Sequence, residues 1–332
     1  MYERLRRHRN LAALPRLRTT KIKRYAGFVT SAMVILGVAV ASTQPWTRHN
    51  PVRTTQAIRY LGLYEPDAPH SYAGINKFAQ AIGRQPNLVS YYSSLTEPFQ
   101  AAFATWAAER GAITLDQMDA ANIPLESIAQ GRYDSYLRSY ASEVKAFGAK
   151  VIVSFDHEMN GAWYSWGYKN TSPAAFIAAW RHIVTVFREL GVRNVIWLWT
   201  VNIINTFNNL IPDPARWWPG SSYVDWVGLD GYYFTSSWTF ASLFGPTITD
   251  VRELTGDPIL IAETGAASAA GQAAKITDLF RGVRTYGLLG FLWFDMDGET
   301  AIQNWRIRDP AVKAVFRQDA AAFMRPEPAP SQ

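Results

Sequence analysis

The spacing of apolar positions changes repeatedly between residues 56 and 325. Short continuous apolar runs alternate with longer segments in which apolar residues recur every three to four positions. Continuous runs are typical of strands buried on both faces, and the longer segments are typical of helices that cover a sheet. The predicted strands are AIRYLGLY (57–64), NLVSYY (87–92), AITLDQM (112–118), KVIVSF (150–155), NVIWLW (194–199), VDWVGL (224–229), PILIAE (258–263) and LLGFLWF (288–294).

Helical segments lie between these runs, and several have recognisable ends. Ser172 followed by Pro173 is typical of a helix start, and Gly191 is typical of a helix end. The stripe formed by Tyr136, Tyr140 and neighbouring apolar residues indicates a helix with one buried face. The predicted helices cover residues 71–83, 97–110, 132–148, 171–191, 271–287 and 309–324.

Strands that alternate with helices predict an α/β fold with a parallel sheet. Eight such units over about 270 residues are typical of a (β/α)8 TIM barrel, which we place at residues 56–325. A doubly wound open sheet is the alternative. It would show a glycine-rich loop after the first strand, but EPDAPHSYAG follows there, without a GxGxxG pattern. We expect residues 326–332 to form a disordered tail.

The net charge of +6 comes from the N-terminus. Residues 1–24 hold nine of the 33 basic residues and one of the 27 acidic residues, so the rest of the chain is nearly balanced. A balanced body does not indicate a nucleic-acid partner. We interpret residues 1–24 as a basic cytoplasmic tail, because a basic segment before an apolar one favours that orientation.

Residues 25–42, YAGFVTSAMVILGVAVAS, carry no charge and are about long enough to cross a membrane. We predict a transmembrane anchor here, followed by a linker at 43–55. Ala39-Val40-Ala41 also matches a signal-peptidase pattern, so a cleaved signal segment is the alternative. In either case the body is extracytoplasmic, either membrane-anchored by residues 25–42 or secreted.

The composition limits the chemistry of the chain. There is no cysteine, and the five histidines show no metal-ligand spacing, so we expect neither a metal site nor a cofactor. The aromatic fraction is 14%, with 13 tryptophans. Such a content suits a surface that stacks flat ligands, although a rich aromatic core is the alternative for any single tryptophan.

Two glutamates stand at the ends of predicted strands. Glu158 follows the strand at 150–155 within Asp156-His157-Glu158, and Glu263 ends the strand at 258–263. In a barrel the active site lies at the carboxyl ends of the strands, so both carboxyl groups should face one cleft. A pair of carboxylates flanked by aromatic rings is typical of glycosidic bond cleavage. A structural salt bridge is the alternative for a lone glutamate.

A family resemblance is carried by HEMNGAWYSWG, which is long and specific. It is followed in order by AAWRHIVTVFRELGVRNVIWLW, YVDWVGLDGY and PILIAETG. These segments resemble glycoside hydrolase family 26, which comprises β-mannanases with some β-glucanases and β-xylanases, and the resemblance covers roughly residues 58–320. It implies that Glu158 is the general acid/base and Glu263 the nucleophile of a configuration-retaining enzyme. It also implies that the subsite of cleavage is lined by His157, Trp163, Asp230 and Tyr232.

Further substrate-binding residues are expected near the same strand ends. Trp163 and Trp166 are predicted sugar platforms, and Tyr232 is expected to donate a hydrogen bond to Glu263. We add Asn202 and Trp293, which end the fifth and eighth predicted strands. Asn160 and Gly161 are expected to form a turn and not to contact substrate.

The sequence also departs from the family. Ser154 stands where the family often has arginine, and no histidine lies between His70 and His157, where family mannanases tend to carry another one. The glycan therefore stays open at this point. Candidates are β-1,4-mannan and a related β-glucan.

We predict a retaining endo-β-glycanase that hydrolyses β-linked polysaccharide by a two-glutamate double displacement, acting as a monomer. The alternative is a non-catalytic carbohydrate-binding accessory protein of polysaccharide export on the same barrel. A binding-only barrel usually loses one carboxylate, whereas both are present here. A third interpretation, a membrane-anchored interaction domain, does not explain two strand-end glutamates beside aromatic residues.

Overall fold

The computed structural model describes residues 59–204, 211–298 and 303–325. The predicted tail, anchor and linker at 1–24, 25–42 and 43–55 lie outside the described residues, and so does the predicted C-terminal tail at 326–332. These assignments stay predictions. Within the described part of the chain, no helix combines the length and the apolar character needed to cross a membrane.

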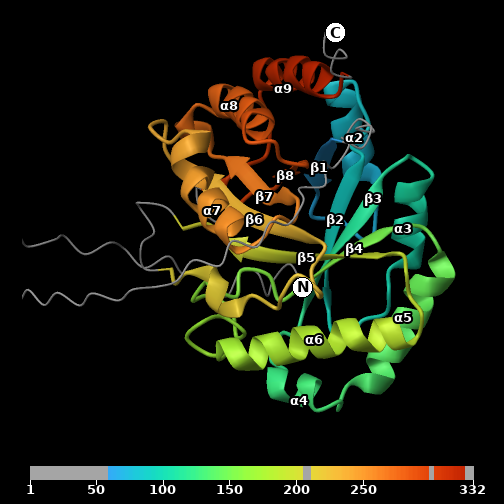
Figure 1. Ribbon diagram of the computed structural model, residues 1–332. Helices are drawn as coiled ribbons and strands as arrows, with labels where there is room; N and C mark the ends of the chain where they lie inside the picture. Colours follow the sequence, from blue (N-terminus) through green and yellow to red (C-terminus); the bar gives the residue numbers. More distant parts are fainter. Residues whose placement is uncertain (1–58, 205–210, 299–302, 326–332) are drawn as a thin grey trace, which may run out of the picture. The chain divides into compact units, whose positions relative to one another are not determined.

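Eight parallel strands form a closed barrel in chain order, and β8 pairs with β1 to complete it (Figure 1). The predicted (β/α)8 fold is therefore confirmed. The strands are β1 (Tyr60–Tyr64), β2 (Leu88–Ser94), β3 (Ile113–Asp119), β4 (Val151–Phe155), β5 (Val195–Asn202), β6 (Trp226–Tyr233), β7 (Ile259–Ala266) and β8 (Gly290–Phe294).

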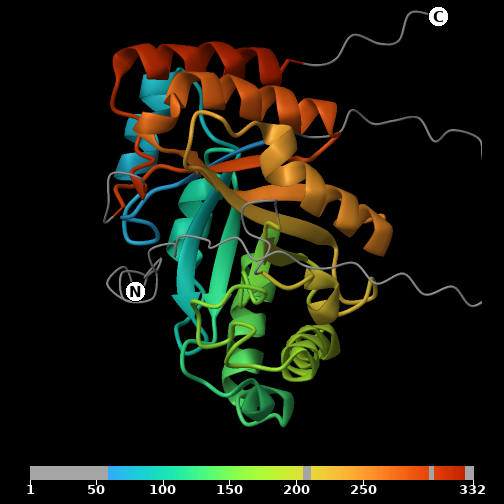
Figure 2. The ribbon, with the colours of Figure 1, turned by 90° about the vertical axis from the view of Figure 1, so that its left-hand side faces the viewer.

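Helices lie outside the strands and cover them (Figure 1). Helix α6 begins as predicted, with the Ser172 hydroxyl accepting a hydrogen bond from the Ala175 amide. Figure 2 shows α8 and α9, in orange and red, lying side by side. The helices are α2 (Ala73–Ile82), α3 (Ala101–Ala108), α4 (Leu125–Ala129), α5 (Asp134–Phe147), α6 (Pro173–Glu189), α7 (Phe240–Leu254), α8 (Gln272–Thr285) and α9 (Pro310–Phe323).

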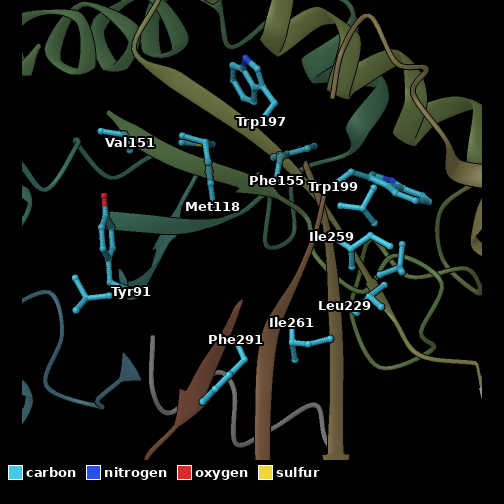
Figure 3. Close-up of a cluster of buried hydrophobic side chains, with 14 of the residues drawn as sticks. Tyr91, Met118, Val151, Phe155, Trp197, Trp199, Leu229, Ile259, Ile261 and Phe291 are labelled. Atoms are coloured by element: carbon cyan, nitrogen blue, oxygen red, sulfur yellow. The ribbon is translucent and has the colours of Figure 1, made fainter. Parts of the chain in front are cut away.

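Buried apolar side chains form two clusters, one on each face of the sheet. Ile152 belongs to the inner cluster and its neighbour Val153 to the outer one, because successive residues of a strand point to opposite faces. Figure 3 shows part of the outer cluster, in which side chains such as Phe155 and Trp199 project from neighbouring strands. Much of the aromatic content therefore builds the layer between strands and helices.

Two features of the fold differ from the sequence prediction. Several strands continue past the apolar runs, so that β6 reaches Tyr233 and β7 reaches Ala266. Neighbouring strands are joined by backbone hydrogen bonds, so polar side chains at the barrel mouth do not interrupt the sheet. Helices α4 and α7 were not predicted; within α7, Gly245-Pro246 is a pattern typical of turns, yet Pro246 lies inside this helix.

Candidate active site

Strand β7 is irregular where it carries Glu263. Ile261 pairs with Leu229 of β6, but Glu263, two residues further on, pairs with Asp230, only one residue further on. The register between β7 and β8 shifts over the same interval. Ala262 points inward, so regular alternation would turn the Glu263 side chain outward. Over this interval β7 has one more residue than β6, and this bulge turns Glu263 inward instead. The carboxyl group of Glu263 therefore reaches the inside of the barrel mouth.

The backbone after β4 is held in an unusual conformation. Asp156 and Glu158 have φ of 48° and 54°, in the left-handed region that costs non-glycine residues about 1–3 kcal/mol each. The Asp156 carboxylate accepts a hydrogen bond from the Ala120 amide at 2.7 Å. The Asp156 amide donates to Met118, and the Glu158 amide donates to Thr200, each at 2.9 Å. Contacts to β3 and β5 therefore fix the turn that presents Glu158.

The two glycines of HEMNGAWYSWG are required by close packing. A Cβ atom on Gly161 would lie 2.4 Å from the Trp163 ring, and one on Gly167 would lie 2.3 Å from the Gly161 carbonyl oxygen. The Asn160 side chain donates to the Asn202 carbonyl at 2.8 Å and accepts from its amide at 2.9 Å. Asn160 and Gly161 thus form the predicted turn and tie it to β5.

Glu158 is buried and accepts hydrogen bonds on both carboxyl oxygens. The Trp163 indole donates to Oε2 at 2.7 Å, and the Asn202 side-chain amide donates to Oε1 at 2.6 Å. Trp163 and Asn202 are only partly buried, so they connect Glu158 to the open side of the mouth. The structure brings these three candidates together.

Glu263 is held by groups from two other strands. The Tyr92 hydroxyl of β2 donates to Oε1, and the Tyr232 hydroxyl of β6 donates to Oε2 at 2.6 Å. The predicted bond from Tyr232 is therefore confirmed. Burial, and then the charge of Glu263, raise the pKa of Tyr92 well above its usual value. The Tyr92 phenol consequently remains a protonated donor.

His157 is fully buried and connects the two glutamates. It is the residue directly before Glu158 in the chain. Its Nε2 atom lies 3.8 Å from Oε1 of Glu263. Its Nδ1 lies 3.3 Å from Oδ1 of Asp119. Burial alone would lower the pKa of His157, but Asp119, and then the charges of Glu263 and Glu158, raise it to about 9. A cation therefore stands at the base of the site at neutral pH.

Trp166 and Trp293 lie away from the open mouth. The Trp166 indole donates to the His157 carbonyl at 2.8 Å, and its ring stacks on Tyr164 with centroids 4.4 Å apart. Trp166 thus supports the turn from behind. Trp293 belongs to the outer cluster, 5.9 Å from the Phe316 ring of α9. This placement corrects its predicted role, because strand alternation sends Trp293 outward and its neighbour inward.

Sequence reasoning missed three residues of the site. Tyr92 ends a predicted strand, and Asp119 lies one residue beyond another, so an inspection of the second and third strand ends would have found both. Tyr164 lies inside the motif loop, and its hydroxyl is 3.1 Å from Nε2 of His157. Asp230, which was predicted, is buried within β6 and pairs in register with Glu263.

Among the described residues, His157, Asp230 and Glu263 have donor atoms that all lie within 4.8 Å of one another. This spacing would suit a cation. Both carboxyl oxygens of Glu263 already accept phenol hydrogen bonds, however, and Nδ1 of His157 faces Asp119. Glu263 and His157 are thus directed at protein groups, and we assign no chemistry to a metal here.

The same region of the chain carries the decisive likeness to known proteins. The sequence profile of glycosyl hydrolase family 26 matches residues 84–279, which is more than half of the chain. The chain belongs to glycosyl hydrolase family 26. The matched range includes Glu158 and Glu263 together with their partners Tyr92 and Tyr232.

Relatives in this family agree with the assignment. The chain is 30% identical over 269 residues to "Endoglucanase H" of Acetivibrio thermocellus, which is 76% of this chain and 29% of the relative. It is 32% identical over 167 residues to a "Mannan endo-1,4-beta-mannosidase" of Thermothelomyces thermophilus, which is 49% of this chain and 29% of the relative. The chain thus matches less than a third of the length of each.

Solved structures show the same fold. The Bacillus subtilis mannanase BCman superposes with a TM-score of 0.59 at 18% identity, over 79% of this chain and 85% of that one. A second similar structure is a β-mannanase from a symbiotic protist of the termite Reticulitermes speratus, complexed with gluco-manno-oligosaccharide. It superposes with a TM-score of 0.56 at 14% identity, over 78% of this chain and 86% of that one. At these identities the likeness concerns the barrel fold alone.

Ser154, where the sequence departs from the family, has a local hydrogen-bond partner. The Ser154 hydroxyl lies 2.8 Å from the Thr200 hydroxyl inside the barrel, so the two side chains satisfy each other. The carboxyl group of Glu263 instead receives its hydrogen bonds from Tyr92 and Tyr232. In this family member, phenols and an imidazole surround the second glutamate.

Proposed function

We propose that this family 26 protein is a retaining endo-β-glycanase that hydrolyses β-1,4-mannan or a related β-glucan through Glu158 and Glu263. The observation that carries the proposal is the unequal setting of two buried glutamates at one barrel mouth. Glu263 is surrounded by two phenol donors and an imidazole, whereas Glu158 bonds to side chains that reach the open side. Double displacement needs this division of roles.

Glu263 is the nucleophile in this proposal. The hydrogen bonds from Tyr92 and Tyr232, and the cation at His157, all favour its ionised form. An ionised carboxylate attacks the anomeric carbon directly. The same donors also orient the carboxyl plane, because they come from strands on different sides of the barrel mouth.

Glu158 is the acid/base. As an oxygen of Glu263 bonds to the anomeric carbon, the proton of Glu158 passes to the glycosidic oxygen and the leaving chain departs. The ionised Glu158 then takes a proton from water, whose oxygen attacks the same carbon and releases Glu263. Two inversions at one carbon retain its configuration.

The substrate-binding assignment follows from the surroundings of the two glutamates. The partly exposed ring of Trp163 offers a sugar platform beside Glu158, and Asn202 offers an amide to a sugar hydroxyl. His157, Asp230 and Tyr232 form the base of the cleavage subsite. The names of the two relatives, an endoglucanase and a mannosidase, support a β-linked polysaccharide as substrate.

An extracytoplasmic location completes the proposal. Residues 25–42 are uncharged and follow a basic segment, a pattern that favours either an anchor or a secretion signal. A polysaccharide too large to enter the cell requires its hydrolase outside.

Reducing-sugar release tests the proposed activity. The wild type and a Glu263→Ala variant are incubated with mannan, mixed-linkage glucan, β-1,3-glucan and xylan. We expect the wild type to cleave mannan or a β-glucan, with early products of several chain lengths as internal cleavage requires, and the variant to show background only. Equal release by both proteins, or none from any polymer, would reject the proposal.

A further inference from the structure

His157 lies between two acidic side chains. Nδ1 lies 3.3 Å from Oδ1 of Asp119 in β3, and Nε2 lies 3.8 Å from Oε1 of Glu263 in β7 and 3.1 Å from the Tyr164 hydroxyl. The imidazole has no solvent exposure. A buried imidazole between two carboxylates is stabilised as a cation, because each carboxylate favours the protonated ring.

Asp119 is fixed behind His157. It is the last residue of β3, and its backbone carbonyl accepts a hydrogen bond from the Leu95 amide at 2.9 Å. Its side chain is 12% exposed, and the His157 ring, which is fully buried, separates it from Glu263. Asp119 therefore reaches Glu263 through His157.

We propose that Asp119 is a positioning residue that holds His157 as a cation directed at Glu263. The inference rests on the proposed function, in which Glu263 is the nucleophile. The cation favours ionised Glu263 before attack. It also favours the departure of the Glu263 carboxylate when the glycosyl ester is hydrolysed, because negative charge returns to that group.

The other ionisable groups around His157 are consistent with a cation. Burial alone would lower its pKa, and Asp119 is the strongest of the groups that together raise it to about 9. The other ionisable groups that the described residues place around the ring are acids and phenols. These groups are Asp156 and Glu158 after β4, Asp230 of β6, Glu263 of β7, Tyr92 of β2 and Tyr164 of the motif loop.

Asp119→Asn tests the proposal, and Asp116→Asn is its matched control. Asp116 is a buried aspartate on the same strand, but its carboxylate accepts hydrogen bonds from Tyr140 and Ser93 and does not face His157. The His157 ring is titrated by NMR in the full chain, with its signal identified by its loss in His157→Gln. The expected midpoint is about 9 in the wild type and in Asp116→Asn, and at least one unit lower in Asp119→Asn.

The pH dependence of kcat/KM gives the second measurement. The substrate is the 2,4-dinitrophenyl β-mannobioside or β-cellobioside, because such a leaving group departs without a proton from Glu158. The alkaline limb of Asp119→Asn should move to lower pH together with the His157 midpoint, while that of Asp116→Asn should stay. A loss of activity by one factor at every pH, without movement of the limb, would overturn the proposal.

The NMR titration decides the inference independently of the activity. A wild-type midpoint at or below the ordinary value of 6.5 would overturn the proposal, even if Asp119→Asn did not fold. An unchanged midpoint in Asp119→Asn would do so as well. If the wild type hydrolyses no glycoside, the proposed function fails, whereas a shifted midpoint would still support the Asp119–His157 pairing.

Discussion

Three groups from three different parts of the barrel converge on Glu263. Tyr92 comes from β2, Tyr232 comes from β6, and His157 follows β4. A hydrogen bond to a charged group contributes about 1.5–3 kcal/mol. The surroundings of this single carboxyl group therefore carry enough free energy to determine its ionisation and its orientation.

Removal of one phenol measures that contribution. Tyr92→Phe should lower kcat/KM about 10- to 100-fold, because the ionised Glu263 loses a donor. Tyr91→Phe is the matched control, since Tyr91 directly precedes Tyr92 in β2 but belongs to the outer cluster. We expect the control to keep its activity, and thermal melts should report the stability of both variants. Equal activity losses in the two variants would contradict the assigned role of Tyr92.

The two candidate glutamates and several of their hydrogen-bond partners were predicted from the sequence, whereas Tyr92 and Asp119 were not. Glu158 and Glu263 follow long apolar runs, and an acid in such a position is conspicuous. Tyr92 and Asp119 act through the tertiary structure, because their partners lie 171 residues away in the first case and on the turn after β4 in the second. Both stand at the ends of predicted strands, but no local pattern shows which partner each of them meets.

At the scale of elements, two backbone irregularities present the glutamates. The shifted register of β7 turns Glu263 inward, and the left-handed residues after β4 turn Glu158 toward the mouth. The run PILIAE predicts a strand but not its register, because register depends on pairing with both neighbouring strands. The strand could therefore be predicted from the sequence, but the bulge could not.

The motif loop after β4 gives a prediction at this scale. A methyl group at Gly161 would lie 2.4 Å from the Trp163 ring, so Gly161→Ala should displace the indole that donates to Glu158. We expect kcat/KM to fall at least about 10-fold, in line with a lost hydrogen bond to a carboxyl group. Gly256→Ala is the control, because no atom lies within 4 Å of its added Cβ. Full activity of Gly161→Ala in steady-state assays would show that the loop does not need this contact.

At the scale of the whole molecule, the barrel was predictable because its strands are continuous apolar runs separated by helices. The interior nevertheless holds ionisable groups whose pKa values depend on burial. Burial raises the pKa of Asp116 from 3.8 to about 7, against the hydrogen bonds from Tyr140 and Ser93. The pKa of Glu65 is also raised to about 7, mainly by burial and against the charge of Arg306.

These shifts predict how stability depends on pH. A folded pKa above the unfolded one means that the folded chain keeps protons which the unfolded chain releases, so stability is lost as pH rises through the folded value. The stabilising contributions of Asp116 and Glu65 are lost as the pH rises to about 7. The contribution of His157 is lost between pH 6.5 and about 9. All three act in the same direction.

Urea unfolding at pH 5 and pH 8 measures the combined effect of these three groups on the free energy of unfolding. The free energy of unfolding should be lower at pH 8 by at least about 2 kcal/mol, since one pKa unit corresponds to about 1.4 kcal/mol. Asp116→Asn should reduce this difference, because it removes one of the titrating groups. A free energy that is equal or higher at pH 8 would contradict the raised pKa values.

The proposed roles of Glu158 and Glu263 are distinguished by comparing Glu158→Ala and Glu263→Ala on a 2,4-dinitrophenyl glycoside with added azide. Glu158→Ala should show a burst, because the glycosyl-enzyme forms without acid help but is hydrolysed slowly, and azide should restore turnover with a product of retained configuration. Glu263→Ala should show no burst, and any azide product should be inverted. A burst in Glu263→Ala and none in Glu158→Ala would contradict the account.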